Sequence, residues 1–373
     1  MLRRLLGFCT RAGHAEQSHI ERGKTLAAAG RHADAVVAYG QAIAVNAISA
    51  EAHYRLGLAW RDQQKFPAAI ECYRRALAIR PDYIEVHNNL GVVLQLDNRL
   101  ADALACYRRA VELSPDFSQP YLNLGRLCEI LGQRQEAARC YRMAISAKID
   151  PETFRHLLDA AEGVTTSRAP AAYARTVFDS FAEHFDHRLV DDLGYRIPQI
   201  LCERVIALCG PCKLRVLDLG CGTGLCGAQI KHACKWLAGV DVSPAMLAIA
   251  RRQKIYDSLT ELDVAEYLTS APVAAFDVAL AADVFIYIGD LTEIFTAVAR
   301  ALAAEGVFAF SVERAMDEHD YVLQPNGRYA QSARYIRRIA AHAGLTEVES
   351  FGQTIRGAPG TGAPGLVFLL RKS

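Results

Sequence analysis

The segment LRVLDLGCGTGLCGAQIK occupies residues 214–231 and decides the fold of the C-terminal half of the chain. An apolar run, Leu214–Leu219, is followed by glycine at positions 220, 222 and 224 and then by a helix-like stretch that continues to Lys235. Glycine lets a backbone turn sharply and approach a bound ligand closely. The segment therefore predicts a buried strand, a ligand-binding turn and a helix, in that order.

The alternation of strand and helix continues to the end of the chain. Further strand-like runs cover residues 236–242, 259–263, 276–282 and 307–312, with helix-like segments such as Pro244–Gln253 between them. The runs 348–355 and 366–370 predict a final antiparallel pair. Together these seven runs predict a Rossmann-like α/β domain with a doubly wound, mostly parallel sheet.

Acidic residues lie at four of the predicted strands: Asp218, Asp241, Asp263 and Asp283. Ligands of doubly wound sheets bind at the carboxyl ends of the strands, so we expect these side chains to surround one site. The turn has the form Asp218-x-Gly220-x-Gly222-x-Gly224, whereas a dinucleotide fingerprint needs Gly or Ala at position 225, where Leu225 stands. In this motif residues 173–373 resemble class I S-adenosylmethionine-dependent methyltransferases.

The resemblance implies S-adenosylmethionine as the cofactor, a molecule with a sulfonium and an ammonium cation but no phosphate. It implies that Asp218 lies beside the cationic methionine end and that Asp241 binds the ribose hydroxyls. Asp263 is expected to bind the adenine amino group, and Met246 to lie against the adenine ring. The expected cofactor site is completed by Cys221, Val242, Val264, Ala265 and Asp283.

Residues 173–210 precede the first strand and resemble the helical lid that many of these enzymes fold over the cofactor. Phe178, Phe185 and Tyr195 are expected to line the pocket, with ordinary packing inside the lid as the alternative. In detail this half of the chain resembles a bacterial group of predicted methyltransferases that contain tetratricopeptide repeats.

The N-terminal half repeats with a period of 34 residues. Four columns share the period: Gly23, Gly57, Gly91 and Gly125; Ala35, Ala69, Ala103 and Ala137; Tyr39, Tyr73, Tyr107 and Tyr141; Ala42, Ala76, Ala110 and Ala144. Small residues let helices approach closely, and a unit of two helices must stack on its neighbours to bury its apolar face. Residues 16–149 resemble four tetratricopeptide (TPR) repeats, so we expect an α solenoid.

Such repeats resemble binders of proteins and peptides, with a groove lined by the first helix of each unit. Asn89 and Asn123 occupy the same repeat position, two residues before the repeated glycine of their unit. Stacked amides can donate to and accept from the backbone of an extended peptide. A short asparagine ladder is therefore one interpretation, and a polar, solvated helix face is the other.

The remaining sequence sets the expected domain limits and partners. Residues 1–15 are expected to be a lead-in, residues 150–172 a linker with a connecting helix, and residues 173–373 the methyltransferase domain. The net charge of +1 gives no reason to expect nucleic acid, and no apolar run has the roughly 20 residues of a membrane span. The spread of eleven cysteines favours reduced thiols and a cytoplasmic location. No His, Cys or Asp cluster has metal-ligand spacing, so no metal is expected.

Candidates for catalysis and for binding the methyl acceptor follow the fourth and fifth strands. They are Asp283, His319, Tyr321, Arg328 and Tyr329, with a plain surface loop at 319–329 as the alternative. The sequence Asp283-Val284-Phe285-Ile286 lacks the Pro-Pro box of enzymes that methylate DNA bases or glutamine.

Three functions remain open at this point. The first is methylation of a protein or peptide that the TPR groove recruits. The second is methylation of a small molecule, with the repeats used for assembly or targeting. The third is an interaction scaffold with a non-catalytic methyltransferase fold, which the intact set of acids and glycines disfavours.

Overall fold

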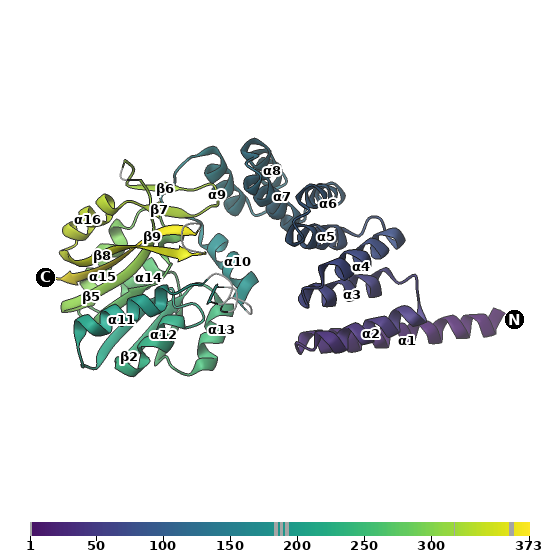
Figure 1. Cartoon of the computed structure of the whole chain (residues 1–373), viewed down its shortest axis with the longest axis horizontal. Helices are drawn as coiled ribbons and strands as arrows, with labels where there is room; N and C mark the ends of the chain where they lie inside the picture. The colour runs from purple at the N-terminus through teal and green to yellow at the C-terminus, as the bar shows by residue number, and fades with distance from the viewer. Residues whose placement is uncertain (1, 183–185, 187–188, 191–193, 317, 358–361) are drawn as a thin grey trace. The chain divides into compact units, whose positions relative to one another are not determined.

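The structure is a computed structural model that describes residues 2–182, 186, 189–190, 194–316, 318–357 and 362–373. It divides into two compact units, Met1–Phe154 and Arg155–Ser373 (Figure 1). The finer domain limits expected at residues 15, 149 and 172 stay predictions.

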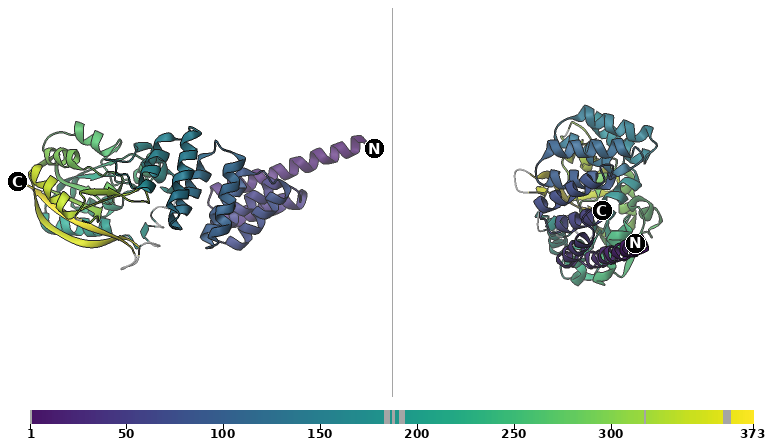
Figure 2. Two further views of the ribbon diagram at one scale, coloured as in Figure 1. Left: turned by 90° about the horizontal axis from the view of Figure 1, so that it is seen from above. Right: turned by 90° about the vertical axis from the view of Figure 1, so that its right-hand side faces the viewer.

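The first unit consists of helical hairpins that stack in sequence order (Figure 2). Its helices are α1 (Leu2–Ala28), α2 (His32–Val45), α3 (Ala50–Asp62), α4 (Phe66–Ile79), α5 (Ile84–Leu96), α6 (Leu100–Leu113), α7 (Ser118–Ile130) and α8 (Arg134–Ser146). Each odd-numbered helix packs on the even-numbered helix that follows it and on the one that precedes it, which buries the faces that a single hairpin leaves open.

The repeated glycines and tyrosines contact each other within each hairpin. A Cβ atom placed on Gly57 would lie 2.5 Å from Cε1 of Tyr73, and one on Gly91 would lie 2.6 Å from Cε1 of Tyr107. The glycines at 23 and 125 are crowded in the same way by Tyr39 and Tyr141. The first helix thus needs glycine because the tyrosine ring of the second helix rests on its backbone, which explains why both columns share one period.

The second unit is built on one large sheet. Its strands are β1 (Leu214–Leu219), β2 (Cys234–Asp241), β3 (Ser258–Glu261), β4 (Phe276–Ala281), β5 (Leu302–Glu313), β8 (Leu345–Arg356) and β9 (Ala363–Lys372). Their order is β3-β2-β1-β4-β5-β9-β8; the first five strands pair in parallel, and β9 runs antiparallel between β5 and β8. Strands β2 and β3 are added on one side of β1, and β4 and β5 on the other. The loops that follow β1 and β4 therefore lead away in opposite directions and leave a crevice between them.

Helices α11 (Ile197–Cys209) and α12 (Leu225–Ile230) cover one face of this sheet, and α14 (Val264–Ser270), α15 (Thr292–Ala301) and α16 (Ala333–His342) cover the other. Helix α13 (Pro244–Gln253) contacts β2, β3 and α10 (Ala171–Phe181). Helix α9 (Pro151–Glu162) spans the division between the units. Two 3₁₀ turns, η3 (Lys231–Ala233) and η4 (Phe285–Tyr287), and a small antiparallel hairpin, β6 (Tyr321–Leu323) with β7 (Tyr329–Gln331), complete the unit.

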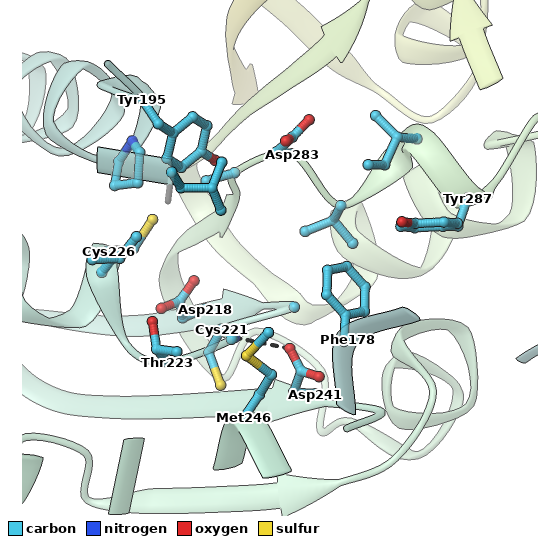
Figure 3. Close-up of a pocket in the computed structure, with 18 of the residues that line it drawn as sticks. Phe178, Tyr195, Asp218, Cys221, Thr223, Cys226, Asp241, Met246, Asp283 and Tyr287 are labelled. Carbon is cyan, nitrogen blue, oxygen red and sulfur yellow. Dashed lines mark hydrogen bonds between the residues drawn. The ribbon is translucent and has the colours of Figure 1, made fainter. Parts of the chain in front are cut away.

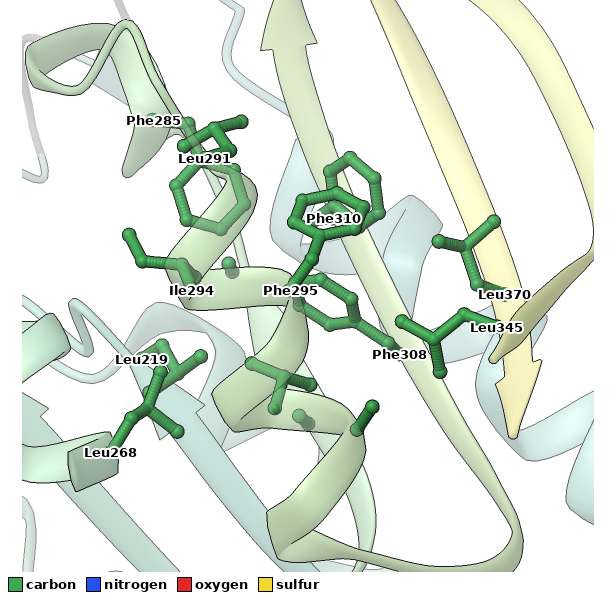
Figure 4. Close-up of a cluster of buried hydrophobic side chains, with 14 of the residues drawn as sticks. Leu219, Leu268, Phe285, Leu291, Ile294, Phe295, Phe308, Phe310, Leu345 and Leu370 are labelled. Atoms are coloured by element: carbon green, nitrogen blue, oxygen red, sulfur yellow. The ribbon is translucent and has the colours of Figure 1, made fainter. Parts of the chain in front are cut away.

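The core of this unit lies on the two faces of the sheet. On one face Phe295 of α15 packs edge-on against Phe308 and Phe310 of β5, with ring centroids 5.3 Å apart in both pairs (Figure 4). On the other face Leu201 and Val205 of α11 pack against β1, β4 and β5. Burial on both faces explains why the parallel strands are continuous apolar runs rather than alternating ones.

Three details differ from the sequence-based expectations. The helix expected to reach Lys235 ends at Ile230, and β2 begins at Cys234. The segment 319–329, for which a plain surface loop is the alternative to an acceptor site, contains the hairpin β6–β7. The residues after α9 are fastened to that hairpin rather than free: the hydroxyls of Thr166 and Tyr329 lie 2.5 Å apart. Polar residues such as Thr166, which had suggested a linker, therefore form hydrogen bonds within the fold.

Within the described ranges, none of the helices is long and apolar enough to cross a bilayer.

Candidate functional site

A cavity of about 350 Å³ lies at the carboxyl ends of β1, β2 and β4, next to α10. Figure 3 shows Asp283 and Tyr195 across the cavity from Asp241 and Met246. Its lining joins acidic, basic and aromatic side chains with the glycine turn: Val177, Phe178, Leu189, Tyr195, Pro198, Asp218, Gly220, Cys221, Gly222, Thr223, Leu225, Cys226, Asp241, Met246, Ala282, Asp283, Val284, Ile286, Tyr287, Arg328 and Arg356. Most of the residues expected around the cofactor are therefore gathered in one place.

The turn after β1 adopts a backbone conformation that favours glycine. Gly220, Gly222 and Gly224 have φ values of 63°, 53° and 104°, which are strained for residues with a Cβ. A Cβ on Gly220 would also lie 2.6 Å from Cγ2 of Val284. The turn leaves backbone atoms at the cavity wall, as the sequence predicted.

Asp241 is held in place by the backbone of two loops. One carboxylate oxygen accepts the N–H of Gly222 and the other the N–H of Ser243, both at 2.8 Å. The side chain is almost fully buried, and this burial raises its pKa. An ionised carboxylate has about four acceptor positions. After these two bonds Asp241 can still accept two more hydrogen bonds from a ligand.

Asp218 is buried beside a tyrosine that the sequence did not single out. The Tyr256 hydroxyl donates to a carboxylate oxygen of Asp218 at 2.6 Å, yet burial dominates and raises the pKa of Asp218 to about 7. A Cβ on Gly227 would lie 2.5 Å from the Tyr256 hydroxyl oxygen, and one on Gly239 would lie 2.9 Å from its ring. Tyr256 follows α13 in an irregular segment and belongs to no motif. The only sequence signal for its position is the pair of glycines against which its side chain packs.

Asp283 follows β4 in a left-handed conformation, with φ at 61°. Its N–H donates to the Ser311 hydroxyl at 2.9 Å, and one carboxylate oxygen lies 2.9 Å from Nη1 of Arg356. The other oxygen is buried and has no hydrogen-bond partner among the residues that the structure describes. Burial raises the pKa of Asp283 to about 6, although Arg356 opposes the shift. Backbone strain and an unpaired buried oxygen in a cavity wall are features of functional sites.

A buried charge network continues from Asp283 to the β6–β7 hairpin. Arg356 also pairs with Glu313, and Glu313 accepts a hydrogen bond from Gln324 at 2.8 Å. Nη1 of Arg328, which lines the cavity, lies 3.7 Å from Glu313. Arg356 is a site residue that sequence reasoning missed, because it ends β8 far along the chain from any motif.

The lid region contributes aromatic and polar contacts. The ring of Phe178 on α10 meets the ring of Tyr287 edge-on at 5.4 Å, and both residues line the cavity. An oxygen of Asp179 accepts a hydrogen bond from the Ser243 hydroxyl at 2.5 Å. Tyr195 lines the cavity as expected, whereas Phe185 lies outside the described residues.

A second hollow of about 60 Å³ shares Gly220, Asp241, Val284 and Tyr287 with the main cavity. Val242, Asp263 and Val264 line it. One oxygen of Asp263 caps α14 by accepting the N–H of Ala265 at 2.9 Å. The other accepts a hydrogen bond from Arg168 at 2.7 Å. Of the two residues expected at the adenine, Asp263 lines this hollow, whereas Met246 lines the main cavity.

The acceptor-side candidates are separated by the structure. Asp283 and Arg328 line the cavity. Tyr329 is fully buried and its hydroxyl pairs with Thr166, while the Tyr321 ring packs 5.6 Å from that of Tyr335. Neither tyrosine is among the lining residues, nor is His319, which is exposed. Both tyrosines pack the β6–β7 hairpin against the rest of the unit, because their side chains point away from the cavity.

In the repeat unit, the two groove asparagines are engaged by neighbouring side chains. Asn89 donates to the Tyr54 hydroxyl at 3.1 Å and accepts from Arg61 at 3.2 Å. Asn123 donates to Oδ1 of Asn88 at 2.9 Å and accepts from Gln119. Both side chains remain partly exposed. Asn123 keeps one N–H for a peptide after these bonds.

Family models match both units. One described as a methyltransferase domain matches residues 217–308. A TPR repeat model matches residues 57–98, and two tetratricopeptide repeat models match 84–117 and 118–148. Methyltransferase-like protein 27 of Homo sapiens is 33% identical over 106 residues, which are 28% of this chain and 43% of that protein. The chain therefore spans less than half of that relative.

Two solved structures are also similar. The 1,6-didemethyltoxoflavin-N1-methyltransferase of Burkholderia thailandensis, solved with 1,6-didemethyltoxoflavin and S-adenosylhomocysteine, has 21% identity and a TM-score of 0.44 over 56% of this chain and 92% of its own. MamA has 27% identity and a TM-score of 0.34 over 36% of this chain and 78% of its own. By the family models, the chain joins tetratricopeptide repeats to a methyltransferase domain, as expected. The cofactor of such a domain is S-adenosylmethionine.

Proposed function

We propose that this chain transfers a methyl group from S-adenosylmethionine to a side chain of a protein or peptide that its repeats recruit. The observation that carries the cofactor part is the set of buried carboxylates, Asp218, Asp241 and Asp283, around one cavity. Burying a carboxylate is unfavourable unless a cation or hydrogen-bond donors compensate. A ligand with a sulfonium, an ammonium and two ribose hydroxyls supplies both.

The residues present fit this cofactor in three ways. The unpaired oxygen of Asp283 and the raised pKa of Asp218 both favour a cationic group between them. Asp241 keeps acceptor positions for two hydroxyls. Asp263, at the far end, would hold the adenine amino group. When bound, the cofactor supplies a methyl carbon that its sulfonium makes reactive.

The repeats are the argument for a side chain of a larger molecule. TPR models match residues 57–98, 84–117 and 118–148, and repeats of this kind commonly bind proteins. The cavity of about 350 Å³ is within the usual range of ligand sites and opens to solvent, so an acceptor side chain can enter it while the rest of its protein stays outside.

Asp283 is our candidate for receiving the acceptor's proton. Its carboxylate is oriented by Arg356 on one oxygen and by the strained backbone, while the other oxygen is buried at the cavity wall. With a pKa of about 6 it is mostly ionised at neutral pH and remains basic enough to take a proton. Arg356 and Arg328 oppose the burial that raises the pKa of Asp283 and so favour its ionised form.

The test is to incubate the purified full chain and a cell extract with methyl-tritiated cofactor. We expect label in one or a few proteins, and less of it when Asn89→Ala and Asn123→Ala are combined. The Asp241→Ala variant is the negative control. Label found only in small molecules would contradict the protein acceptor while leaving the methyltransferase assignment in place. Absence of label in every fraction would contradict catalysis itself.

A further inference from the structure

The segment between α9 and α10 is part of the methyltransferase unit rather than a passive connection. The carbonyl of Ser167 accepts the N–H of Gly289 at 2.8 Å, and Ala169 donates its N–H to the carbonyl of Tyr287 at 2.9 Å. Arg168, between them, forms an antiparallel bridge with Ile288. These bonds add the segment to the chain that follows β4, directly beside the cavity.

Arg168 reaches from this fixed backbone to the base end of the site. Its Nη2 lies 2.7 Å from Oδ2 of Asp263, and both side chains are partly exposed. The other Asp263 oxygen accepts the N–H of Ala265 at 2.9 Å. The carboxylate is thus fixed from both sides, with acceptor positions to spare.

Small residues beside Arg168 leave the hollow open. Ala169, Ala171 and Ala174 line the second hollow together with Arg168 and Asp263. A larger side chain at any of these positions would fill a space of about 60 Å³. The segment therefore forms one wall of the hollow and supplies its only arginine among the described lining residues.

We propose that Arg168 is a positioning residue that makes the site selective for a 6-aminopurine. The inference rests on the proposed cofactor site and goes beyond it, because it assigns a part in base recognition to the segment between α9 and α10. By pairing with Oδ2 of Asp263, Arg168 holds that carboxylate in place beside the hollow. An ionised carboxylate only accepts hydrogen bonds, so it favours an amino group and repels the carbonyl oxygen of a 6-oxopurine.

The experiment measures binding of S-adenosylhomocysteine and S-inosylhomocysteine by calorimetry on the full chain. We expect the native chain to prefer the adenosyl compound about a hundredfold, since sites built to bind an N–H discriminate strongly against its loss. Arg168→Met should weaken binding of S-adenosylhomocysteine about tenfold. It should reduce the preference for this compound over S-inosylhomocysteine from about a hundredfold to about tenfold. Arg168→Lys should recover part of both, because it restores the charge without the guanidinium fork.

Two controls separate selectivity from folding. Arg252→Met removes an exposed arginine at the end of α13 and should change neither affinity. Partly exposed ion pairs add little to stability, so Arg168→Met should unfold at the same temperature as Arg252→Met. In a cycle with Asp263→Asn, the two substitutions together should cost no more than Asp263→Asn alone.

The outcomes are distinct. If Arg168→Met weakens both compounds by the same factor, or neither, Arg168 has no selective role and the inference is overturned while the cofactor site stands. If the native chain binds both purines alike, base selectivity is overturned. If it binds neither, the proposed cofactor site and this inference are overturned together.

Discussion

The two units treat their polar side chains differently. In the repeat unit, Asn89 and Asn123 stay partly exposed and bond to neighbouring repeat side chains. In the methyltransferase unit, Asp218 is buried and the side chain of Asp283 is 11% exposed at a cavity, and one oxygen of Asp283 lacks a partner among the described residues. The repeat unit also holds a buried atom of this kind, the hydroxyl oxygen of Tyr73. The difference is that Asp283 carries a carboxylate and lines a cavity, so an unpaired buried atom points to a site only where space for a ligand adjoins it.

The largest expected effect would come from removing the carboxylate that joins the two loops of the cofactor site. Asp241→Ala leaves two buried N–H groups, of Gly222 and Ser243, without their acceptor. Losing these bonds lowers stability, and the variant also lacks the acceptor for the two ribose hydroxyls of the proposed site. At about 1.5 to 3 kcal/mol for each hydrogen bond to a charged group, S-adenosylhomocysteine should bind at least about a hundredfold more weakly in calorimetry. Glu266→Ala, an exposed acid on α14, is the matched control. Equal affinity in both variants would refute the role of Asp241.

The next effect is confined to the repeat unit and tests packing alone. Gly91→Ala places a Cβ 2.6 Å from Tyr107 and should lower the free energy of unfolding by about 1 to 3 kcal/mol. The helical Gly40 has nothing within 4 Å of such a Cβ, so Gly40→Ala should instead stabilise by about 0.5 to 1 kcal/mol. Urea unfolding followed by circular dichroism measures both. The same sign for the two variants would contradict the Gly–Tyr explanation.

A smaller effect should appear in the pH dependence of stability. The pKa values of Asp218 and Asp283, about 7 and about 6, exceed the ordinary value of 3.8, so the folded unit binds more protons than the unfolded chain between about pH 4 and 7. Their contribution to stability is therefore lost as pH rises through that window.

The check is the unfolding temperature between pH 5 and 8, with and without S-adenosylmethionine. Asp283→Asn should flatten the curve, and the cationic ligand should stabilise most at the higher pH. A curve for Asp283→Asn parallel to that of the native chain would contradict the raised pKa.

The smallest effect concerns the groove. Asn123→Ala removes a part-buried hydrogen bond to Asn88 and an exposed one from Gln119, and should cost about 1 kcal/mol of unfolding free energy. In a pull-down, the Asn123→Ala variant should recover much less of the methylated protein identified in the extract than the native chain does, although the variant remains folded. A variant with native capture would leave the asparagines as ordinary solvated residues.

Sequence periodicity and motifs predicted much of this molecule, and the reasons are local. The glycine and tyrosine columns repeat because each repeat makes the same contact between them. The turn at Gly220 needs a positive φ, which the closely spaced glycines predict. Asp218, Asp241 and Asp283 could be brought together because the ends of parallel strands share one edge.

The missed residues depend on contacts between distant parts of the chain. Arg356 reaches Asp283 from the end of β8, the edge strand that β9 separates from the parallel strands, and Tyr256 reaches Asp218 from an irregular segment. Arg168 lay in a segment whose composition is that of a linker. Tyr329 looked like a catalytic candidate because its position after β5 was known and its orientation was not.

Binding of S-adenosylmethionine by the carboxylates around the glycine turn is tested most directly by calorimetric titration of the purified full chain. The two titrants are S-adenosylhomocysteine and, in parallel, a nicotinamide dinucleotide. We predict one binding site for the former, with micromolar affinity, and no measurable heat for the latter. Binding of the dinucleotide without binding of the homocysteine nucleoside would contradict the account.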